Sequence, residues 1–118
     1  MGLRILIAGD DEDLREVLGE LLAAWGHEVT SAADGLTAVR LGLQQRPDVA
    51  LIDISLPGLD GAAAARRIRA GTDGKVFTVA LTGHLTNEAS KDFDCFLLKP
   101  ASTEELQRIL EGRQHAAA

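Results

Sequence analysis

The sequence predicts an α/β domain built on a single doubly wound, five-stranded parallel sheet with helices on both faces. Its 118 residues fall within the usual size of one compact domain. Apolar residues make up 46% of the chain and charged residues 25%, which is typical of a folded globular protein and not of a disordered one. Short apolar runs alternate five times with helical patterns, and such βα units assemble into one parallel sheet.

Five short runs are predicted as strands. The first, residues 3–8, is mostly apolar and stops at Gly9, as expected for a strand that is buried on both faces. The second, residues 28–32, is more polar and suits the edge of a sheet. The other three are residues 49–52, which end at Asp53, residues 76–81, which end at Thr82, and residues 96–98, which end at Lys99.

The first two helices are predicted from apolar spacing and from their end residues. Asp34 is expected to cap a second helix that runs to about residue 45, and Gly26 is expected to end the first. The inner face of the first helix is predicted to consist of Leu14, Val17, Leu18, Leu21, Leu22 and Trp25, and that of the second of Leu36, Val39 and Leu43.

The remaining helices follow the third, fourth and fifth strands. Asp60 is expected to cap an Ala-rich helix that runs to about residue 70, and residues 85–91 are a short helical candidate. Ser102 and Glu105 have the spacing of a capping box, which opens a last helix to about Gly112. We therefore expect one domain over residues 1–112 and a short flexible tail over residues 113–118.

Charge and cysteine content exclude several function classes. The formal net charge is −6, and the stretch from Asp10 to Glu20 carries −5, with six acids and one base. Nucleic acid is not expected as a direct partner, because phosphate binding needs clustered Lys and Arg. The single cysteine, Cys95, cannot form an internal disulfide, and three scattered histidines do not form a zinc site.

The sequence also lacks the signals of membrane insertion and export. No apolar run approaches the ~18 residues of a membrane helix, and no signal-peptide pattern opens the chain. We therefore expect a cytoplasmic location and no membrane partner.

Chemically active side chains follow four of the predicted strands. In an open parallel sheet, ligands bind beyond the carboxyl ends of the strands. Asp10 and Asp11 follow the first strand, Asp53 the third, Thr82 the fourth and Lys99 the fifth. The topology therefore predicts that these five side chains converge on one crevice.

The three carboxylates of this group predict a Mg²⁺ site. Crowded carboxylates repel one another, and a hard divalent cation with oxygen ligands relieves this repulsion. Asp10, Asp11 and Asp53 are the candidate ligands, and a backbone carbonyl just after Asp53, such as that of Ser55, could complete the site.

The other two side chains suit an anion. Thr82 offers a hydroxyl donor and Lys99 a compact positive charge. Together with a carboxylate and Mg²⁺ they describe a site for phosphoryl transfer to an aspartate.

Four segments resemble the response regulator receiver domain. The resemblance covers residues 3–112 and implies a flavodoxin-like sheet with the strand order 2-1-3-4-5. The segments are residues 7–12 (IAGDDE), 53–61 (DISLPGLDG), 81–83 (LTG) and 98–100 (LKP).

The resemblance implies a phosphorelay and a role for each residue of the crevice. Asp53 would accept a phosphoryl group from a histidine kinase or a histidine phosphotransfer protein, and Asp10 and Asp11 would hold Mg²⁺. Lys99 would pair with the phosphoryl group, and Thr82 would move to hydrogen-bond it. The chain would promote only its own phosphorylation and dephosphorylation, and we expect no other enzyme activity.

Further roles follow from the same resemblance. Phe96 would be the aromatic residue that moves inward with Thr82, and the Lys99–Pro100 peptide would be cis. Ser55 and His84, two residues beyond Asp53 and Thr82, flank the crevice and are candidates for tuning the rate at which the phosphoryl group hydrolyses, in a direction left open. The sequence around Asp53 and Lys99 resembles that of receivers attached to hybrid histidine kinases more than that of DNA-binding regulators.

One region departs from the family pattern. Lys99 lies 17 residues after Thr82, whereas the family usually has about five residues more, which is over one turn of helix at 3.6 residues per turn. Whether this chain uses the fourth helix and fifth strand for output and for dimer contacts, as many receivers do, is therefore left open. Arg66, Arg67 and Arg69 are interpreted as a solvated helix face, with a partner patch as the alternative.

Three other functions compete with the phosphorelay. A constitutive interaction module with the receiver fold and lost switching is supported by the shortened region. A haloacid-dehalogenase-like hydrolase would carry a second Asp two residues after the nucleophile, where this chain has Ser55. Flavin binding needs a Ser/Thr/Gly-rich phosphate loop, but the acids at residues 10–13 would repel the phosphate.

Overall fold

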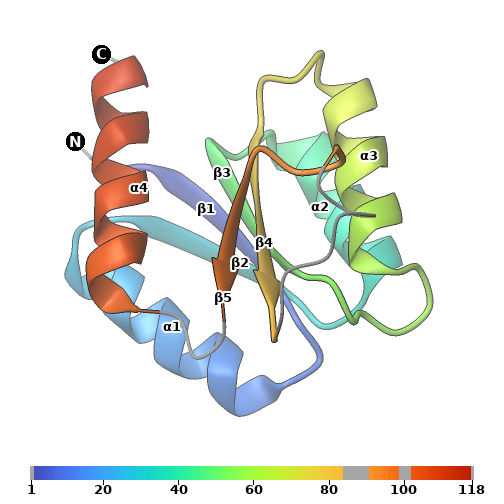
Figure 1. The fold of residues 1–118 in the computed structure, drawn as a ribbon, viewed down its shortest axis with the longest axis horizontal. Helices are drawn as coiled ribbons and strands as arrows, with labels where there is room; N and C mark the ends of the chain where they lie inside the picture. Colours follow the sequence, from blue (N-terminus) through green and yellow to red (C-terminus); the bar gives the residue numbers. More distant parts are fainter. Residues whose placement is uncertain (1, 84–90, 99–101, 118) are drawn as a thin grey trace.

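The computed structural model describes residues 2–83, 91–98 and 102–117. It confirms the predicted fold class: five parallel strands form one sheet in the order β2-β1-β3-β4-β5 (Figure 1). The elements are β1 Arg4–Ala8, α1 Glu12–Ala24, β2 Glu28–Ala32, α2 Gly35–Gln45, β3 Val49–Asp53, α3 Gly61–Gly71, β4 Phe77–Thr82, β5 Cys95–Leu98 and α4 Thr103–Ala117.

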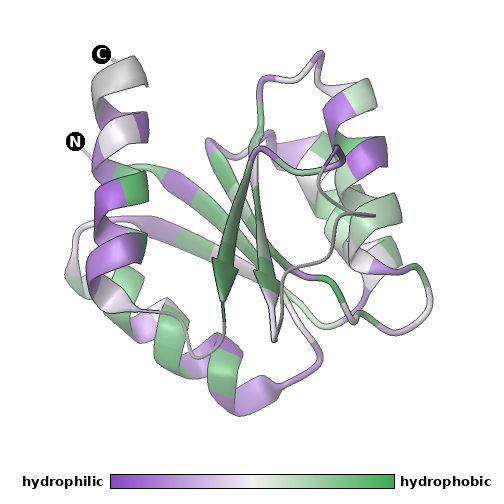
Figure 2. Cartoon of the chain, in the orientation of Figure 1, coloured by the Kyte–Doolittle hydropathy of each residue, from purple (hydrophilic) through white to green (hydrophobic). Residues whose placement is uncertain are grey.

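Two helical layers cover the sheet. α1 and α4 lie on one face, where Leu18, Leu22 and Leu106 pack against β1, β3 and β4. α2 and α3 lie on the other face, where Ala38 and Ile68 pack against the same strands. Figure 2 shows β4 and β5 as mostly hydrophobic, as expected for strands that lie between two helical layers.

The predicted helix caps are confirmed. Asp34 and Asp60 each accept a hydrogen bond at 2.8 Å from the backbone N–H three residues further on. Ser102 Oγ accepts from the N–H of Glu105 at 3.3 Å. Gly26 follows α1 with a φ of +93°, which favours glycine and ends the helix.

Two predicted inner faces need correction. Val17 is 62% exposed, because it lies at the edge of the apolar stripe of α1. Leu36 is 62% exposed and Leu43 39%, so the α2 prediction is wrong for both. α2 approaches α3 closely, and a Cβ on Gly42 would lie 2.8 Å from the Ile68 side chain. The residues of α2 that are fully buried are therefore small: Gly35, Ala38 and Gly42.

The C-terminal helix is longer than expected. α4 continues past Gly112 to Ala117, because the chain after Gly112 contains no further Gly or Pro to end it. The Arg113 guanidinium carbon lies 4.4 Å from the centre of the Phe77 ring, a cation–π geometry. The boundary between a domain over residues 1–112 and a tail over residues 113–118 stays a prediction.

Two further observations bear on sequence predictions. The short helix predicted at residues 85–91 lies outside the described residues, apart from Lys91, which is in a turn. None of the helices in the described ranges is both long and apolar enough to cross a membrane.

Candidate functional site

Asp53 is the last residue of β3 and is nearly buried. Its side chain is at the carboxyl edge of a strand whose five residues are all buried, and Asp53 itself is only 4% exposed. Oδ1 of Asp53 accepts a hydrogen bond from the backbone N–H of Ser55 at 2.9 Å. The sheet therefore presents a single carboxylate, held in one orientation, at the centre of its carboxyl edge.

The loop after β1 passes directly beside this carboxylate. A Cβ on Gly9 would lie 3.8 Å from Cβ of Asp53, because β1 and β3 pair in register up to Ala8 and Ile52. Asp10 and Asp11 follow Gly9, and both are exposed. The predicted convergence of the first and third strand ends is therefore confirmed for the backbone.

Asp11 has a structural task that sequence analysis did not assign. It is the N-cap of α1, and its Oδ1 accepts from the N–H of Leu14 at 3.2 Å. Only one of its two carboxylate oxygens is used in this bond, so capping leaves the second oxygen as a potential ligand.

The donor set fits Mg²⁺ by its chemistry. Asp10, Asp11 and Asp53 offer carboxylate oxygens only, which suits a hard cation. Within the described residues, no three His, Cys, Asp or Glu side chains already form a metal-binding group. Mg²⁺ usually takes only one or two carboxylates and keeps several water ligands.

Thr82 and Phe96 lie on one face of the neighbouring strands. Thr82 ends β4 and is 6% exposed. β5 pairs with β4 so that Phe96 is opposite Ala80 and Leu98 is opposite Thr82. Because side chains alternate along a strand, Phe96 and Thr82 point to the same face. Lys99, Pro100 and His84 lie outside the described residues.

Two glycines shape the segment after Asp53, and sequence analysis did not single them out. The N–H of Gly61 donates to the carbonyl of Ile54 at 2.9 Å, and a Cβ on Gly61 would overlap the carbonyl oxygen of Asp53. A Cβ on Gly35 would likewise overlap the carbonyl oxygen of Leu59. In both cases the glycine follows a capping aspartate, so the two Asp-Gly pairs were the available signal.

The arginines of α3 are not simply a solvated face. Arg66 Nε lies 3.3 Å from Asp92 Oδ1, and Arg69 Nη2 lies 3.4 Å from Asp94 Oδ1. Arg66 and Arg67 are exposed, as the interpretation expects, whereas Arg69 is half-buried; the two ion pairs were not predicted. The partners of Arg66 and Arg69 are about 25 residues away in the chain, which sequence spacing alone does not reveal.

Comparison with known proteins agrees with this fold. The model of the response regulator receiver domain family matches residues 5–111. The chain belongs to this family.

Individual relatives come from both solved structures and curated proteins. The receiver domain of the sensor histidine kinase PA1611 from Pseudomonas aeruginosa PAO1 is 38% identical, with a TM-score of 0.83 over 94% of this chain and 96% of that one. That structure is described with a magnesium ion coordinated in its active-site cleft. The chemotaxis protein CheY4 of Vibrio cholerae is 25% identical, with a TM-score of 0.84 over 94% of this chain and 98% of that one.

The curated relatives are longer proteins. The response regulator MprA of Mycobacterium sp. (strain KMS) is 34% identical over 110 residues, which is 90% of this chain and 48% of MprA. A probable transcriptional regulator, ycf27 of Guillardia theta, is 31% identical over 107 residues, 88% of this chain and 42% of that protein. The chain thus spans about half the length of these relatives.

Proposed function

We propose that this chain is the phosphoacceptor of a two-component phosphorelay and that Asp53 receives the phosphoryl group. The observation that carries the proposal is the position of Asp53: a nearly buried carboxylate at the carboxyl edge of the sheet, beside the loop that carries Asp10 and Asp11. Family membership supports the same chemistry.

The transfer needs only a positioned nucleophile and charge neutralisation. A carboxylate oxygen of Asp53 attacks phosphorus, and a P–O bond forms as the P–N bond to the donor imidazole breaks. The imidazole leaves with a proton from solvent. The N–H of Ser55 holds the Asp53 carboxylate in place through Oδ1, which fixes the direction of attack.

Asp10, Asp11 and Asp53 would hold Mg²⁺, with the backbone carbonyl of Ser55 as a further ligand. The bound ion would neutralise charge on the transferred phosphoryl oxygens. The magnesium described in the PA1611 receiver supports this assignment.

The other site residues would act on the phosphorylated state. Thr82 would hydrogen-bond the phosphoryl group and Phe96 would follow it inward, since both lie on the same face of adjacent strands. Lys99, directly after β5, would pair with the phosphoryl oxygens. Ser55 and His84 would tune hydrolysis.

The donor would be a histidine kinase or a histidine phosphotransfer protein in the cytoplasm. A receiver of the hybrid-kinase type is supported by the 38% identity to the PA1611 receiver. The chain would act on no substrate other than its own aspartyl phosphate and would not bind nucleic acid directly.

Intact-mass spectrometry tests the proposal. Incubation with acetyl phosphate and Mg²⁺ should add the mass of one phosphoryl group to the wild-type chain and none to Asp53→Asn. Asp73→Asn is the matched control, because Asp73 is exposed and has a φ of +53°, a backbone conformation that Asn tolerates. An unmodified wild type, or full modification of Asp53→Asn, would refute the proposal.

A further inference from the structure

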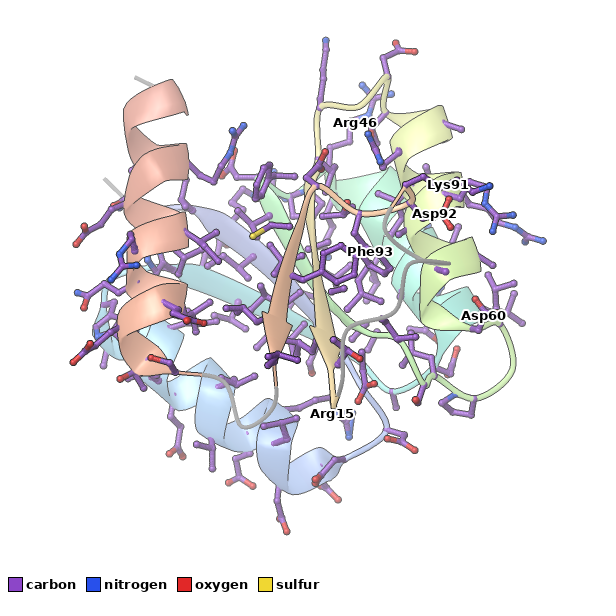
Figure 3. All side chains as sticks on the ribbon, in the orientation of Figure 1. Arg15, Arg46, Asp60, Lys91, Asp92 and Phe93 are labelled. Carbon is purple, nitrogen blue, oxygen red and sulfur yellow. The ribbon has the colours of Figure 1, made fainter. Side chains whose placement is uncertain are left out.

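Two arginines of α3 hold the segment that leads into β5. Arg66 pairs with Asp92, and Arg69 pairs with Asp94, at 3.3 and 3.4 Å. Arg69 also donates through Nη1 to the backbone carbonyl of Lys91 at 3.1 Å. We name these four charged side chains, Arg66, Arg69, Asp92 and Asp94, the α3 clamp. Figure 3 shows Lys91 and Asp92 beside α3.

The acidic half of the clamp is built into the fold. The Asp92 side chain is only 9% exposed, and a carboxylate so deeply buried needs a partner of opposite charge. Arg66 supplies that charge from a side chain that is itself 65% exposed. Asp94 Oδ2 accepts from the backbone N–H of Thr78 at 2.8 Å and from its hydroxyl at 3.2 Å, which joins the clamp to the start of β4.

The clamp connects α3, which contacts Asp53 at its first residue, to the segment that leads into Phe96. At one end of α3, Gly61 packs against the backbone of Asp53 and donates to Ile54. On the other side of the clamp, Phe93 is 4% exposed, and its ring centre lies 5.9 Å from that of Phe96 in β5. Asp53 and Phe96 are therefore linked through α3, the two ion pairs and the chain on either side of Phe93.

β5 depends on such support. It is an edge strand of the described sheet, has four residues, and its neighbour in the sheet is β4. A short edge strand is held by few backbone hydrogen bonds, so contacts at its entry have a large influence on its position.

We propose that Arg66 and Arg69 are positioning residues of the switch. Through the α3 clamp, a displacement of α3 at the phosphorylated Asp53 is passed to Phe93 and β5, so that α3 and residues 91–98 respond together. This inference rests on the proposed function of Asp53. It assigns the output of this receiver to a route along α3.

Hydrogen exchange measured by mass spectrometry tests the route, with Arg66→Gln/Arg69→Gln as the clamp variant. In the unphosphorylated clamp variant, amides of residues 93–98 should exchange faster than in the wild type, on the order of tenfold, while those of α3 stay protected. Arg67→Gln removes a neighbouring charge of the same helix outside the clamp, and its exchange should match the wild type.

Phosphorylation supplies the readout that a purely structural role would not change. In excess acetyl phosphate and Mg²⁺, the wild type should alter its exchange in both α3 and residues 93–98. The clamp variant, phosphorylated to the same extent, should alter it in α3 alone. Arg66→Lys/Arg69→Lys keeps both charges and should restore most of the response in residues 93–98.

The outcomes separate this inference from the proposed function. A full response of residues 93–98 in the clamp variant, or its loss in Arg67→Gln, overturns the route. Absence of phosphorylation in the wild type overturns the proposed function and, with it, the coupled displacement. Equal exchange of the unphosphorylated wild type and clamp variant overturns the clamp itself, whatever the outcome of phosphorylation.

Discussion

The two helical layers that cover the sheet are built from different residues. α1 and α4 pack with large side chains, among them Leu18, Leu22, Leu106 and Leu110. α2 and α3 pack with small ones, and the fully buried residues of α3 before Ile68 are Gly61, Ala64 and Ala65.

This difference determines what each layer does. Where side chains are large, the layer contributes buried apolar area, which stabilises the fold without fixing any one loop. Where side chains are small, the backbones of two segments approach closely, as those of Gly61 and Asp53 and of Gly35 and Leu59 do. The α2–α3 layer therefore sets the position of Asp53 and of the segment that follows it, whereas the α1–α4 layer supplies stability.

The largest effect on stability is expected in the α1–α4 layer. Leu22 is fully buried, and Leu22→Ala should lower the free energy of unfolding by about 3 kcal/mol through lost contacts and a cavity. Urea denaturation measures this loss. The folded fraction should accept phosphate from acetyl phosphate at the wild-type rate. A rate that falls as far as in a variant of the α2–α3 layer would contradict the division of roles.

Gly61→Ala should affect both stability and the site. The new Cβ overlaps the backbone of Asp53, so we expect a loss of about 2 kcal/mol and slower phosphorylation of the folded chain. Gly112→Ala is the matched control, since a Cβ there meets nothing within 4 Å and α4 should gain about 0.5 to 1 kcal/mol. Unchanged stability and rate in Gly61→Ala would show that the close contact is unimportant.

A smaller effect is expected from the cap that precedes this glycine. Asp60 accepts from the N–H of Ala63, and Asp60→Ala should cost about 1 kcal/mol. Asp60→Asn retains an acceptor and should remain close to the wild type. Equal losses in the two variants would mean that the carboxylate charge, and not the hydrogen bond, supports α3.

The smallest effect concerns His27, which lies between α1 and β2. Its Nδ1 accepts from the N–H of Leu3 at 2.9 Å, and burial lowers the pKa of His27 below its ordinary value of about 6.5. The unfolded chain then takes up a proton first, so the contribution of His27 to stability is present above pH 6.5 and is lost as the pH falls toward the folded pKa.

Urea midpoints between pH 7.5 and 5.5 measure this loss. His27→Asn, which offers an acceptor but no titrating group, should lose less stability than the wild type over the same range. An equal or steeper decline in His27→Asn would show that other groups cause the pH dependence.

The sequence was sufficient for the elements that depend on local pattern. Strand ends at Asp53 and Thr82 follow from short apolar runs, and the caps at Asp34 and Asp60 follow from local side chain–backbone chemistry. Parallel topology then brings these strand ends to one edge without any long-range information.

Features that depend on packing between helices, or on ion pairs between distant segments, could not be predicted from local sequence patterns. Leu36 and Leu43 have the spacing of an inner face, but close approach of α2 to α3 favours Gly42 there. The pairing of Arg66 with Asp92 joins residues far apart in the chain, and charge patterning along one helix does not indicate a distant partner.

Locating the phosphoryl group on the chain tests the role of Asp53 most directly. After incubation with acetyl phosphate, peptide mass mapping should place the added mass on the peptide that carries Asp53, in the presence of Mg²⁺ and not in EDTA. A group on the peptide that carries Asp10 and Asp11, or equal labelling in EDTA, would contradict the assignment of Asp53 as a Mg²⁺-dependent phosphoacceptor.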